Sequence, residues 1–348
     1  MSLYPANGHL LLEKRKIKDR RATPLLQTLS NQTEEKMRLS EDQLKQYDAD
    51  GFLIVRNVFQ PRELEPLQRE IDGLVDDLAH RLQRAGKITN LHEDKGFYHR
   101  LTALERDFPG AAVLIHIGGI LKPQLAALWS SPKLLEMIEQ ILGPDIVGHP
   151  VWNLRSKAPA HDLSTVPWHQ DTAYLAAGAE HTFQPTAWIP LIDADSQNGT
   201  IQVLKGGHKF GKVFQHQLEN RKANKASWYL YIEDADLPPG EVVTCEMPMG
   251  SVLLLNQLVP HRSTANLSDR IRWSVDLRWQ RPGEPHGMEG VKDPILMRTA
   301  QDPSYQIDWE VWANTSRNAI EIGRAEKAIE MKDEFNAMVS GPWMDRWM

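Results

Sequence analysis

The sequence predicts a mainly β fold with helices (α+β), in which a β-sandwich or barrel is backed by helices. The N-terminal third shows helix-start signals and helical periodicity. After Gly143–Pro144 the pattern changes to short β-type runs separated by Gly, Pro, Asn and Asp turns. With 348 residues, 41% of them hydrophobic, the chain can also bury a sizeable core. Several short strands behind a helical segment favour a sandwich or barrel.

Three helical segments are predicted before residue 143. Ser40 is a suitable N-cap with Gln43 three residues later, and Gly51 is a suitable stop. Pro61 opens a long amphipathic helix, and a third periodic segment at about 120–142 is interrupted at Ser131–Pro132. The apolar stripe of the long helix comprises Leu64, Leu67, Ile71, Leu74 and Leu78.

The strands are predicted from β-type runs. An early buried strand is expected at 52–59, before the long helix. The later runs are "TAWIPLIDA", "GTIQVLKGG", "EVVTCEM", "SVLLLNQ" and "IRWSVDLRW". Residues 209–240 form a long excursion between two of these strands, which suggests an active-site lid.

Three regions are expected along the chain. Residues 1–38 are polar and weakly patterned, as in a flexible N-terminal leader. The catalytic domain is expected at 39–285. Residues 286–348 would form a C-terminal helical extension, with a helix at 316–335 surrounded by Trp309, Trp312, Trp343 and Trp347. This extension could pack on its own domain or on a neighbouring subunit of a homo-oligomer.

Composition and charge exclude several classes of protein. The formal net charge of −6 argues against a broad nucleic-acid-binding surface. Cys245 is the only cysteine, so no intrachain disulfide can form. No apolar run reaches 18 residues, so no membrane span is expected. No secretory signal is recognisable, and a cytoplasmic location is the default expectation.

The segment "VPWHQDTAYL" at 166–175 contains the first candidate metal ligands. In a strand, His169 and Asp171 would point to the same face and Gln170 to the other. His261 lies 92 residues after His169 and is reachable if two strands are neighbours in a barrel. Two histidines and one carboxylate on one face of a metal form the facial triad of non-haem Fe(II) oxygenases.

The run "IRWSVDLRW" has an unusual division between its two faces. One face is apolar, whereas the other carries Arg272, Ser274, Asp276 and Arg278, as expected of a barrel whose interior holds a charged ligand. Arg272, eleven residues after His261, could bind a carboxylate through two parallel hydrogen bonds.

Other residues complete or compete with this arrangement. Ser263 could donate to the same carboxylate, and Arg270 is the rival anchor. An ion pair of Arg272 with Asp269 or Asp276 is the structural alternative. Arg278 and Asp276 are candidate substrate-binding residues on the barrel interior.

The ordered motifs resemble the phytanoyl-CoA dioxygenase family of Fe(II)/2-oxoglutarate-dependent oxygenases. The matching segments, within residues 39–285, are "WHQD" at 168–171, "TAWIPL…NGTIQVLKGGHKFG" at 186–211 and "HRSTANLSDRIRWS" at 261–274. The resemblance implies a double-stranded β-helix (jelly roll, cupin-like) barrel with helices packed on one sheet.

The resemblance also implies roles for individual residues. His169, Asp171 and His261 would hold Fe(2+), and Arg272 and Ser263 would hold the distal carboxylate of 2-oxoglutarate. The same pattern implies that Trp188, Asn153, Gln170 and His116 belong to the 2-oxoglutarate-binding set. Trp188 also fits plain core packing.

Some positions depart from the family pattern. The family often has lysine at the position of His116 and methionine at that of Asn153, and it usually has "GSH" where this chain has "GGH" at 206–208. Asp171 is present, which disfavours halogenation because halogenating relatives replace this carboxylate with a small residue.

The expected reaction couples conversion of 2-oxoglutarate and O2 to succinate and CO2 to hydroxylation of an aliphatic C–H bond in a small-molecule substrate. Desaturation, cyclisation and epimerisation are not distinguished from hydroxylation by sequence, and the substrate is not predicted. Two alternatives remain. One is a cupin-like metal-dependent isomerase or hydrolase, which would have no use for Arg272 as a carboxylate anchor. The other is a non-catalytic 2-oxoglutarate-binding protein.

Overall fold

The computed structural model divides the chain into two units, Met1–Glu35 and Lys36–Met348, and all described residues belong to the second. The described residues are 37–117, 121–159, 165–218, 229–288, 293–310, 312 and 335. The predicted leader, apart from its last two residues, and the predicted helix at 316–335, apart from Phe335, therefore lie outside the described residues.

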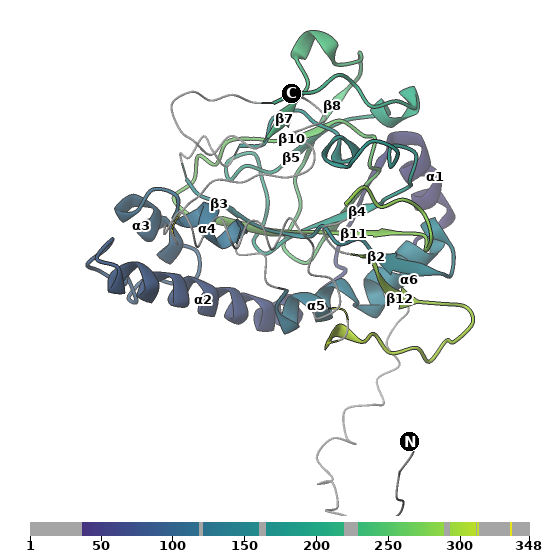
Figure 1. Ribbon diagram of the computed structural model, residues 1–348. Helices are drawn as coiled ribbons and strands as arrows, with labels where there is room; N and C mark the ends of the chain where they lie inside the picture. The colour runs from purple at the N-terminus through teal and green to yellow at the C-terminus, as the bar shows by residue number, and fades with distance from the viewer. Residues whose placement is uncertain are drawn as a thin grey trace, which may run out of the picture. The chain divides into compact units, whose positions relative to one another are not determined.

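Two antiparallel sheets form the centre of the domain. The larger sheet has the strand order β1-β9-β4-β11-β2-β12, with β3 also paired to β11, and the smaller has the order β10-β5-β8. The smaller sheet lies over the larger one in Figure 1, and side chains of both sheets meet in the interior between them. The predicted jelly-roll fold is confirmed. The strands of the larger sheet are β1 (Phe52–Val55), β2 (Ile146–Gly148), β3 (Asn153–Lys157), β4 (Thr186–Pro190), β9 (Val252–Leu255), β11 (Arg272–Gln280) and β12 (Ile295–Arg298).

The smaller sheet consists of β5 (Ile201–Leu204), β8 (Val242–Cys245) and β10 (His261–Ser263). Its free edge at β10 is extended by the segment 166–169. His169 and His261 form a β-bridge, and the Ser263 N–H donates to the Val166 carbonyl at 3.0 Å. A separate pair, β6 (Gln217–Leu218) and β7 (Leu230–Tyr231), lies within the excursion predicted as a lid.

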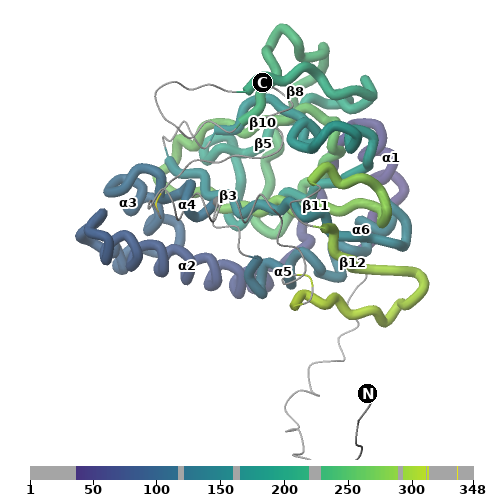
Figure 2. The backbone as a smooth tube through the Cα atoms, viewed as in Figure 1, coloured from purple at the N-terminus to yellow at the C-terminus, as the bar shows by residue number. Residues whose placement is uncertain are grey.

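Helices cover the outer face of the larger sheet. Figures 1 and 2 show α2, α4 and α5 along the side of this sheet that faces away from β5 and β10. The helices are α1 (Glu41–Asp50), α2 (Pro61–Arg84), α3 (Arg100–Asp107), α4 (Ala111–Ile117), α5 (Pro123–Trp129) and α6 (Pro132–Leu142). The predicted Ser40 capping box, the Pro61 start and the break at Ser131–Pro132 are confirmed, whereas α3 and α4 were not predicted.

Strand β11 separates the core from the interior. Because side chains alternate along a strand, Trp273, Val275 and Leu277 point into the apolar core shared with the helices. Arg272 and Asp276, from the opposite face, point between the two sheets and line a cavity there. The predicted division of this strand into an apolar and a polar face is therefore confirmed.

The interior is itself divided. Near β1 and β9 it contains apolar side chains such as Phe52 and Leu253, whereas the charged side chains of the cavity lie nearer β11 and β3. Charged ligand groups are therefore expected on the β11 and β3 side of the barrel.

The C-terminal extension differs from the sequence-based prediction. It begins with a strand, because β12 pairs with β2 and extends the larger sheet beyond residue 285. The short apolar run "ILMR" is too brief to separate from a loop by periodicity. Trp312 is anchored to this part of the domain, since its ring packs at 5.9 Å from that of Trp129.

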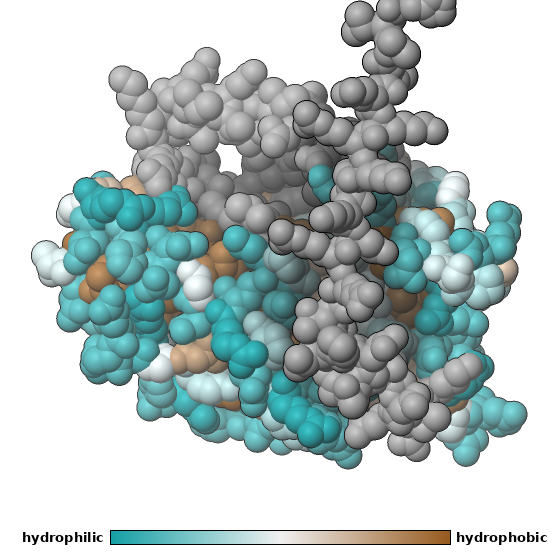
Figure 3. Space-filling model, turned by 90° about the horizontal axis from the view of Figure 1, so that it is seen from below, coloured by the Kyte–Doolittle hydropathy of each residue, from teal (hydrophilic) through white to brown (hydrophobic). Residues whose placement is uncertain are grey.

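The helix layer presents a polar outer surface. Its coloured parts in Figure 3 are mainly hydrophilic with a few apolar patches, as expected for amphipathic helices such as α2. Among the described residues, no helix combines the length and the apolar character needed to cross a membrane.

We predict that Gly250→Ala destabilises the domain more than Gly86→Ala. Both glycines have positive φ, so alanine costs about 1–2 kcal/mol at either site. At Gly250 a Cβ would also lie 2.0 Å from the Phe59 carbonyl oxygen, whereas at Gly86 it meets nothing within 4 Å. The clash should add about 1–3 kcal/mol, measured as the free energy of unfolding in urea. Equal losses in the two variants would contradict this packing.

Candidate metal and co-substrate site

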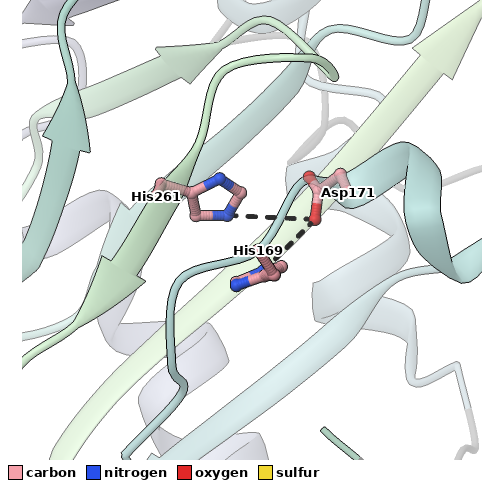
Figure 4. Close-up of side chains that lie close together, drawn as sticks. All are labelled: His169, Asp171 and His261. Carbon is pink, nitrogen blue, oxygen red and sulfur yellow. Dashed lines mark ion pairs between the residues drawn. The ribbon is translucent and has the colours of Figure 1, made fainter. Parts of the chain in front are cut away.

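The three predicted metal ligands converge in the interior. His169 Nε2 and His261 Nε2 each lie 3.9 Å from Asp171 Oδ1, as the dashed lines of Figure 4 mark. One ligand atom from each residue lies within 4.8 Å of the others. All three side chains are at least nine-tenths buried. The sequence-predicted set is thus brought close enough together for its members to share one ion.

The local backbone structure that brings these ligands together differs from the predicted one. His169 lies in a bridge with His261 rather than in a longer strand, and Asp171 begins a 3-10 helix, Asp171–Tyr174. The expectation of two ligands on one regular strand is therefore wrong. Asp171 nevertheless approaches the imidazoles because the chain turns into the helix directly after Gln170, which keeps an extended backbone.

Hydrogen bonds to carbonyls orient both imidazoles. Nδ1 of His169 lies 2.8 Å from the Pro167 carbonyl oxygen, and Nδ1 of His261 lies 3.1 Å from that of Val259. A carbonyl can only accept, so Nδ1 is the donor in each ring and Nε2 is the atom directed toward Asp171. Burial, together with the neighbouring His261, holds the pKa of His169 well below its usual range. Imidazoles fixed through Nδ1 in this way are suited to bind a metal through Nε2.

Side chains from two strands, β4 and β11, bind the Asp171 carboxylate. Arg278 Nη2 donates to Oδ1 at 2.8 Å and Arg278 Nε to Oδ2 at 3.2 Å, and Thr186 Oγ1 donates to Oδ2 at 2.8 Å. Burial alone would raise the pKa of Asp171, but the charge of Arg278 and its hydrogen bonds to the carboxylate hold it well below its usual range. Arg278, predicted to bind substrate, thus fixes the candidate metal-binding carboxylate through Nε and Nη2. Its Nη1 is buried without a hydrogen-bond partner among the described residues, so a contact with substrate stays a prediction.

Arg272 has no carboxylate partner among the described residues. Its Nη1 donates to Ser274 Oγ at 2.7 Å, and its guanidinium lies 5.1 Å from the centre of the Trp188 ring. Its Nε is buried and has no hydrogen-bond partner in the described part of the chain. Burial lowers the pKa of Arg272 to about 10, so the group stays charged at neutral pH. A buried, charged guanidinium of this kind is suited to bind an anionic ligand.

The rival anchor is excluded from the cavity. Arg270 is half exposed and lies 4.0 Å from Asp269 at the surface. It does not line the cavity that contains the three metal-ligand candidates, whereas Arg272 does.

Ser263 and Trp188 lie where the prediction requires them. Both line the cavity with Arg272. Ser263 Oγ accepts from the Val166 N–H at 3.0 Å, so its own hydroxyl hydrogen can donate to a ligand. Trp188 is buried, and its ring supports the guanidinium of Arg272, so packing and positioning are combined in one side chain.

Asn153 and Asp276 belong to a cluster that includes Arg155, a residue not predicted. Arg155 Nε donates to Asp276 Oδ2 at 2.8 Å, and Asn153 Nδ2 donates to the same oxygen at 3.2 Å. Arg155 lines the cavity. Its strand, β3, was not predicted, because "NLRSK" has too few apolar residues for a strand pattern. The alternation of Asn153, Arg155 and Lys157 on one face would have been the signal.

Gln170 does not reach the cavity, so its predicted contact with 2-oxoglutarate is not supported. Its amide nitrogen donates to the carbonyls of Lys212 and Leu258, and its amide oxygen accepts from the Phe214 N–H. The side chain points away from the metal ligands, as strand alternation implies, and ties two loops together.

His116 also lies outside this cavity. It is in α4, with Nδ1 at 3.2 Å from the Leu154 carbonyl oxygen, and it lines a separate cavity of about 420 Å³ beneath the helices. Burial, reinforced by the charge of Arg155, lowers the pKa of His116 to about 4, so the imidazole is neutral. A neutral side chain at this position cannot replace the lysine ammonium found in the family.

The cavity around the metal-ligand candidates is small, about 40 Å³, and most of its lining residues are polar or charged. Its lining residues are Arg155, Val166, His169, Asp171, Thr186, Trp188, Ile201, Leu255, His261, Arg262, Ser263, Arg272, Asp276 and Arg278. A second hollow of about 490 Å³ shares Val166, Arg262 and Ser263 with it and is also lined by Tyr231 and Glu233. The latter two belong to the excursion 209–240, whose action as a lid stays a prediction.

Comparison with known proteins gives a consistent family assignment. The family model for phytanoyl-CoA dioxygenase (PhyH) matches residues 47–274. An ectoine dioxygenase of Bordetella parapertussis is 25% identical over 173 residues, which are 49% of this chain and 50% of that protein. A 1-deoxypentalenic acid 11-beta-hydroxylase of Streptomyces arenae is 30% identical over 173 residues, 46% of this chain and 57% of that protein. This chain therefore matches only about half the length of these two relatives.

A solved structure supports the fold. The apo form of ThoJ, a non-heme monooxygenase, superposes with a TM-score of 0.51 at 18% identity, covering 84% of this chain and 96% of that chain. At this level of identity the likeness concerns the fold alone.

We predict that Arg278→Gln weakens Fe(II) binding by about 10–100-fold, the usual effect of removing a partner of a metal ligand. The loss should arise because Asp171 keeps only its Thr186 hydrogen bond and is no longer fixed toward the imidazoles. Affinity is measured anaerobically by competition with a chromophoric chelator. Arg270→Gln, which removes the same charge at the surface, is the control and should be neutral. A gain in affinity in Arg278→Gln would show instead that the arginine charge opposes the metal.

Proposed function

The chain belongs to the phytanoyl-CoA dioxygenase family, and from this we propose that it is an Fe(II)- and 2-oxoglutarate-dependent dioxygenase that hydroxylates an aliphatic C–H bond of a small organic substrate. Family membership supports the oxygenase class, with iron and 2-oxoglutarate as its cofactor and co-substrate. The observation that carries the proposal for this chain is the convergence of His169, Asp171 and His261 beside a charged Arg272 without a carboxylate partner among the described residues.

The donor atoms fit iron. Two imidazole nitrogens and one carboxylate oxygen are the donor set of the facial triad, which leaves coordination positions for other ligands. Both imidazoles are fixed by carbonyl acceptors and Asp171 by three donors, so little ordering is needed when a metal binds.

The side chains that line the cavity also suit the binding of 2-oxoglutarate. One end of such a ligand would lie at the metal, and its distal carboxylate would reach Arg272, with Ser263 as a second donor. The unpartnered Nε of Arg272 supports this assignment, because a buried charged donor requires an acceptor. A metal-dependent isomerase or hydrolase that does not use 2-oxoglutarate gives no reason for this guanidinium.

Bound iron would supply activation of O2 coupled to the oxidative decarboxylation of 2-oxoglutarate to succinate and CO2. The chain's own residues hold the reactants and exclude water. Trp188 keeps the Arg272 guanidinium in place, and the burial of all three metal-ligand candidates limits solvent access. The name of the Streptomyces relative, a hydroxylase, supports hydroxylation as the outcome.

We predict that Arg272→Ala raises the Kd for 2-oxoglutarate by at least about 30-fold, since truncating one partner of a buried charge pair costs about 2 kcal/mol or more. Fe(II) affinity should stay within about threefold, because Arg272 makes no contact with the metal-ligand candidates. The measurement is an anaerobic titration of the Fe(II) protein with 2-oxoglutarate, followed by the visible charge-transfer band of the chelate.

Arg270→Ala is the matched control, since it removes an arginine from the same segment but outside the cavity. It should bind 2-oxoglutarate like the wild type. If Arg270→Ala loses the band and Arg272→Ala keeps it, the co-substrate assignment is wrong. If wild-type protein binds iron without any band, the oxygenase proposal itself fails.

A further inference from the structure

Arg155 has donor groups that the structure leaves available. Its Nε is bound to Asp276, and Asn153 donates to the same carboxylate oxygen, so the base of the guanidinium is fixed. Neither terminal nitrogen of Arg155 has a hydrogen-bond partner among the described residues. The side chain is about four-fifths buried and lines the cavity of the metal-ligand candidates. A fixed guanidinium with both terminal nitrogens available is suited to bind a carboxylate through two parallel hydrogen bonds.

This group lies beside the co-substrate anchor but on a different strand. Arg272 packs over Trp188 of β4, whereas Arg155 comes from β3, on the opposite side of β11. The Asp276 carboxylate outweighs burial and holds the pKa of Arg155 above its usual range, and Tyr229 and Tyr174 lie near the same guanidinium. The Tyr174 ring in turn lies 5.6 Å from that of His169, edge to face. Arg155 and Arg272 therefore line the same cavity from neighbouring strands, with Arg155 on the β3 side of β11.

The charges of the side chains that line the cavity favour a second anion in addition to 2-oxoglutarate. Arg155, Arg272 and Arg278 carry three positive charges in the cavity, and Asp171 and Asp276 carry two negative ones. Arg262 also lines the cavity, but its charge is not included in this count. Its guanidinium packs over Trp168 and donates to Gln202 Oε1 on the other face of β10. The charges of Fe(II) and of the 2-oxoglutarate dianion would offset each other, so the three arginines exceed the two carboxylates by one positive charge and favour an anionic substrate.

We propose that Arg155 binds a carboxylate of the primary substrate, so that the substrate is a small carboxylate-bearing molecule. This proposal rests on the proposed function. Asp276 and Asn153 act as positioning residues that fix the guanidinium. The carboxylate would anchor the molecule beside Tyr174 and hold a neighbouring C–H bond near the metal. The same guanidinium could alternatively bind the 2-oxoglutarate carboxylate, and the experiment separates these two sources.

The test uses isothermal titration calorimetry under anaerobic conditions, with full-length protein saturated with Fe(II) and 2-oxoglutarate. The probes are propionate and benzoate, each paired with its neutral amide, propionamide and benzamide. In wild type, we expect at least one carboxylate to bind with one-to-one stoichiometry, about tenfold or more tightly than its amide, without release of 2-oxoglutarate.

Two variants assign the binding to Arg155. Arg155→Gln should lose carboxylate binding by about tenfold or more, with less than about threefold change in 2-oxoglutarate affinity. Arg155→Lys, which keeps the charge next to Asp276, should restore part of the binding, and it controls for misfolding through its melting temperature. Arg270→Gln should behave as wild type.

Several outcomes would contradict the role of Arg155. Displacement of 2-oxoglutarate by the carboxylates would place Arg155 in the co-substrate site. Equal binding of acid and amide, unchanged binding in Arg155→Gln, or no binding of either carboxylate to wild type would also overturn the proposal. Failure of wild-type protein to bind 2-oxoglutarate at all would instead contradict the proposed function, and it would be seen before any probe is added.

Discussion

The site depends on the pairing of buried charges inside the barrel. Asp171 cannot remain ionised in this interior without partners, and it has three donors from β4 and β11 in addition to the two imidazoles. Asp276 is stabilised in the same way by Arg155 and Asn153. Arg272, unlike Arg155 and Arg278, has no carboxylate partner within the described residues. The ionic interior thus determines where an external carboxylate can be accepted.

Strand β11 links this interior to the stability of the domain. Its Trp273, Val275 and Leu277 pack in the core beneath the sheet, while the intervening side chains bind Asp171 and line the cavity. A shift of register by one residue would exchange the two faces and bury the apolar side chains among charges. Packing against the helices therefore fixes the position of each arginine in the cavity.

Much of the fold and the set of metal-ligand candidates could be predicted from sequence. The ligand candidates stand in short, ordered motifs, and the faces of β11 follow from strict alternation. The actual partner of Arg278 could not be predicted, because contact with Asp171 depends on how the chain turns at 170–171. Arg155 was missed because β3 is short and polar and gains its strand conformation from pairing with β11 rather than from its own pattern.

The most direct test of the central claim is a crystal structure of the protein prepared anaerobically with Fe(II) and 2-oxoglutarate, with anomalous data collected at the iron edge. The account predicts one iron peak bonded to Nε2 of His169, Nε2 of His261 and a carboxylate oxygen of Asp171. It also predicts the distal carboxylate of 2-oxoglutarate on Arg272. Iron bound elsewhere, or a co-substrate carboxylate on Arg155 with Arg272 unengaged, would contradict it.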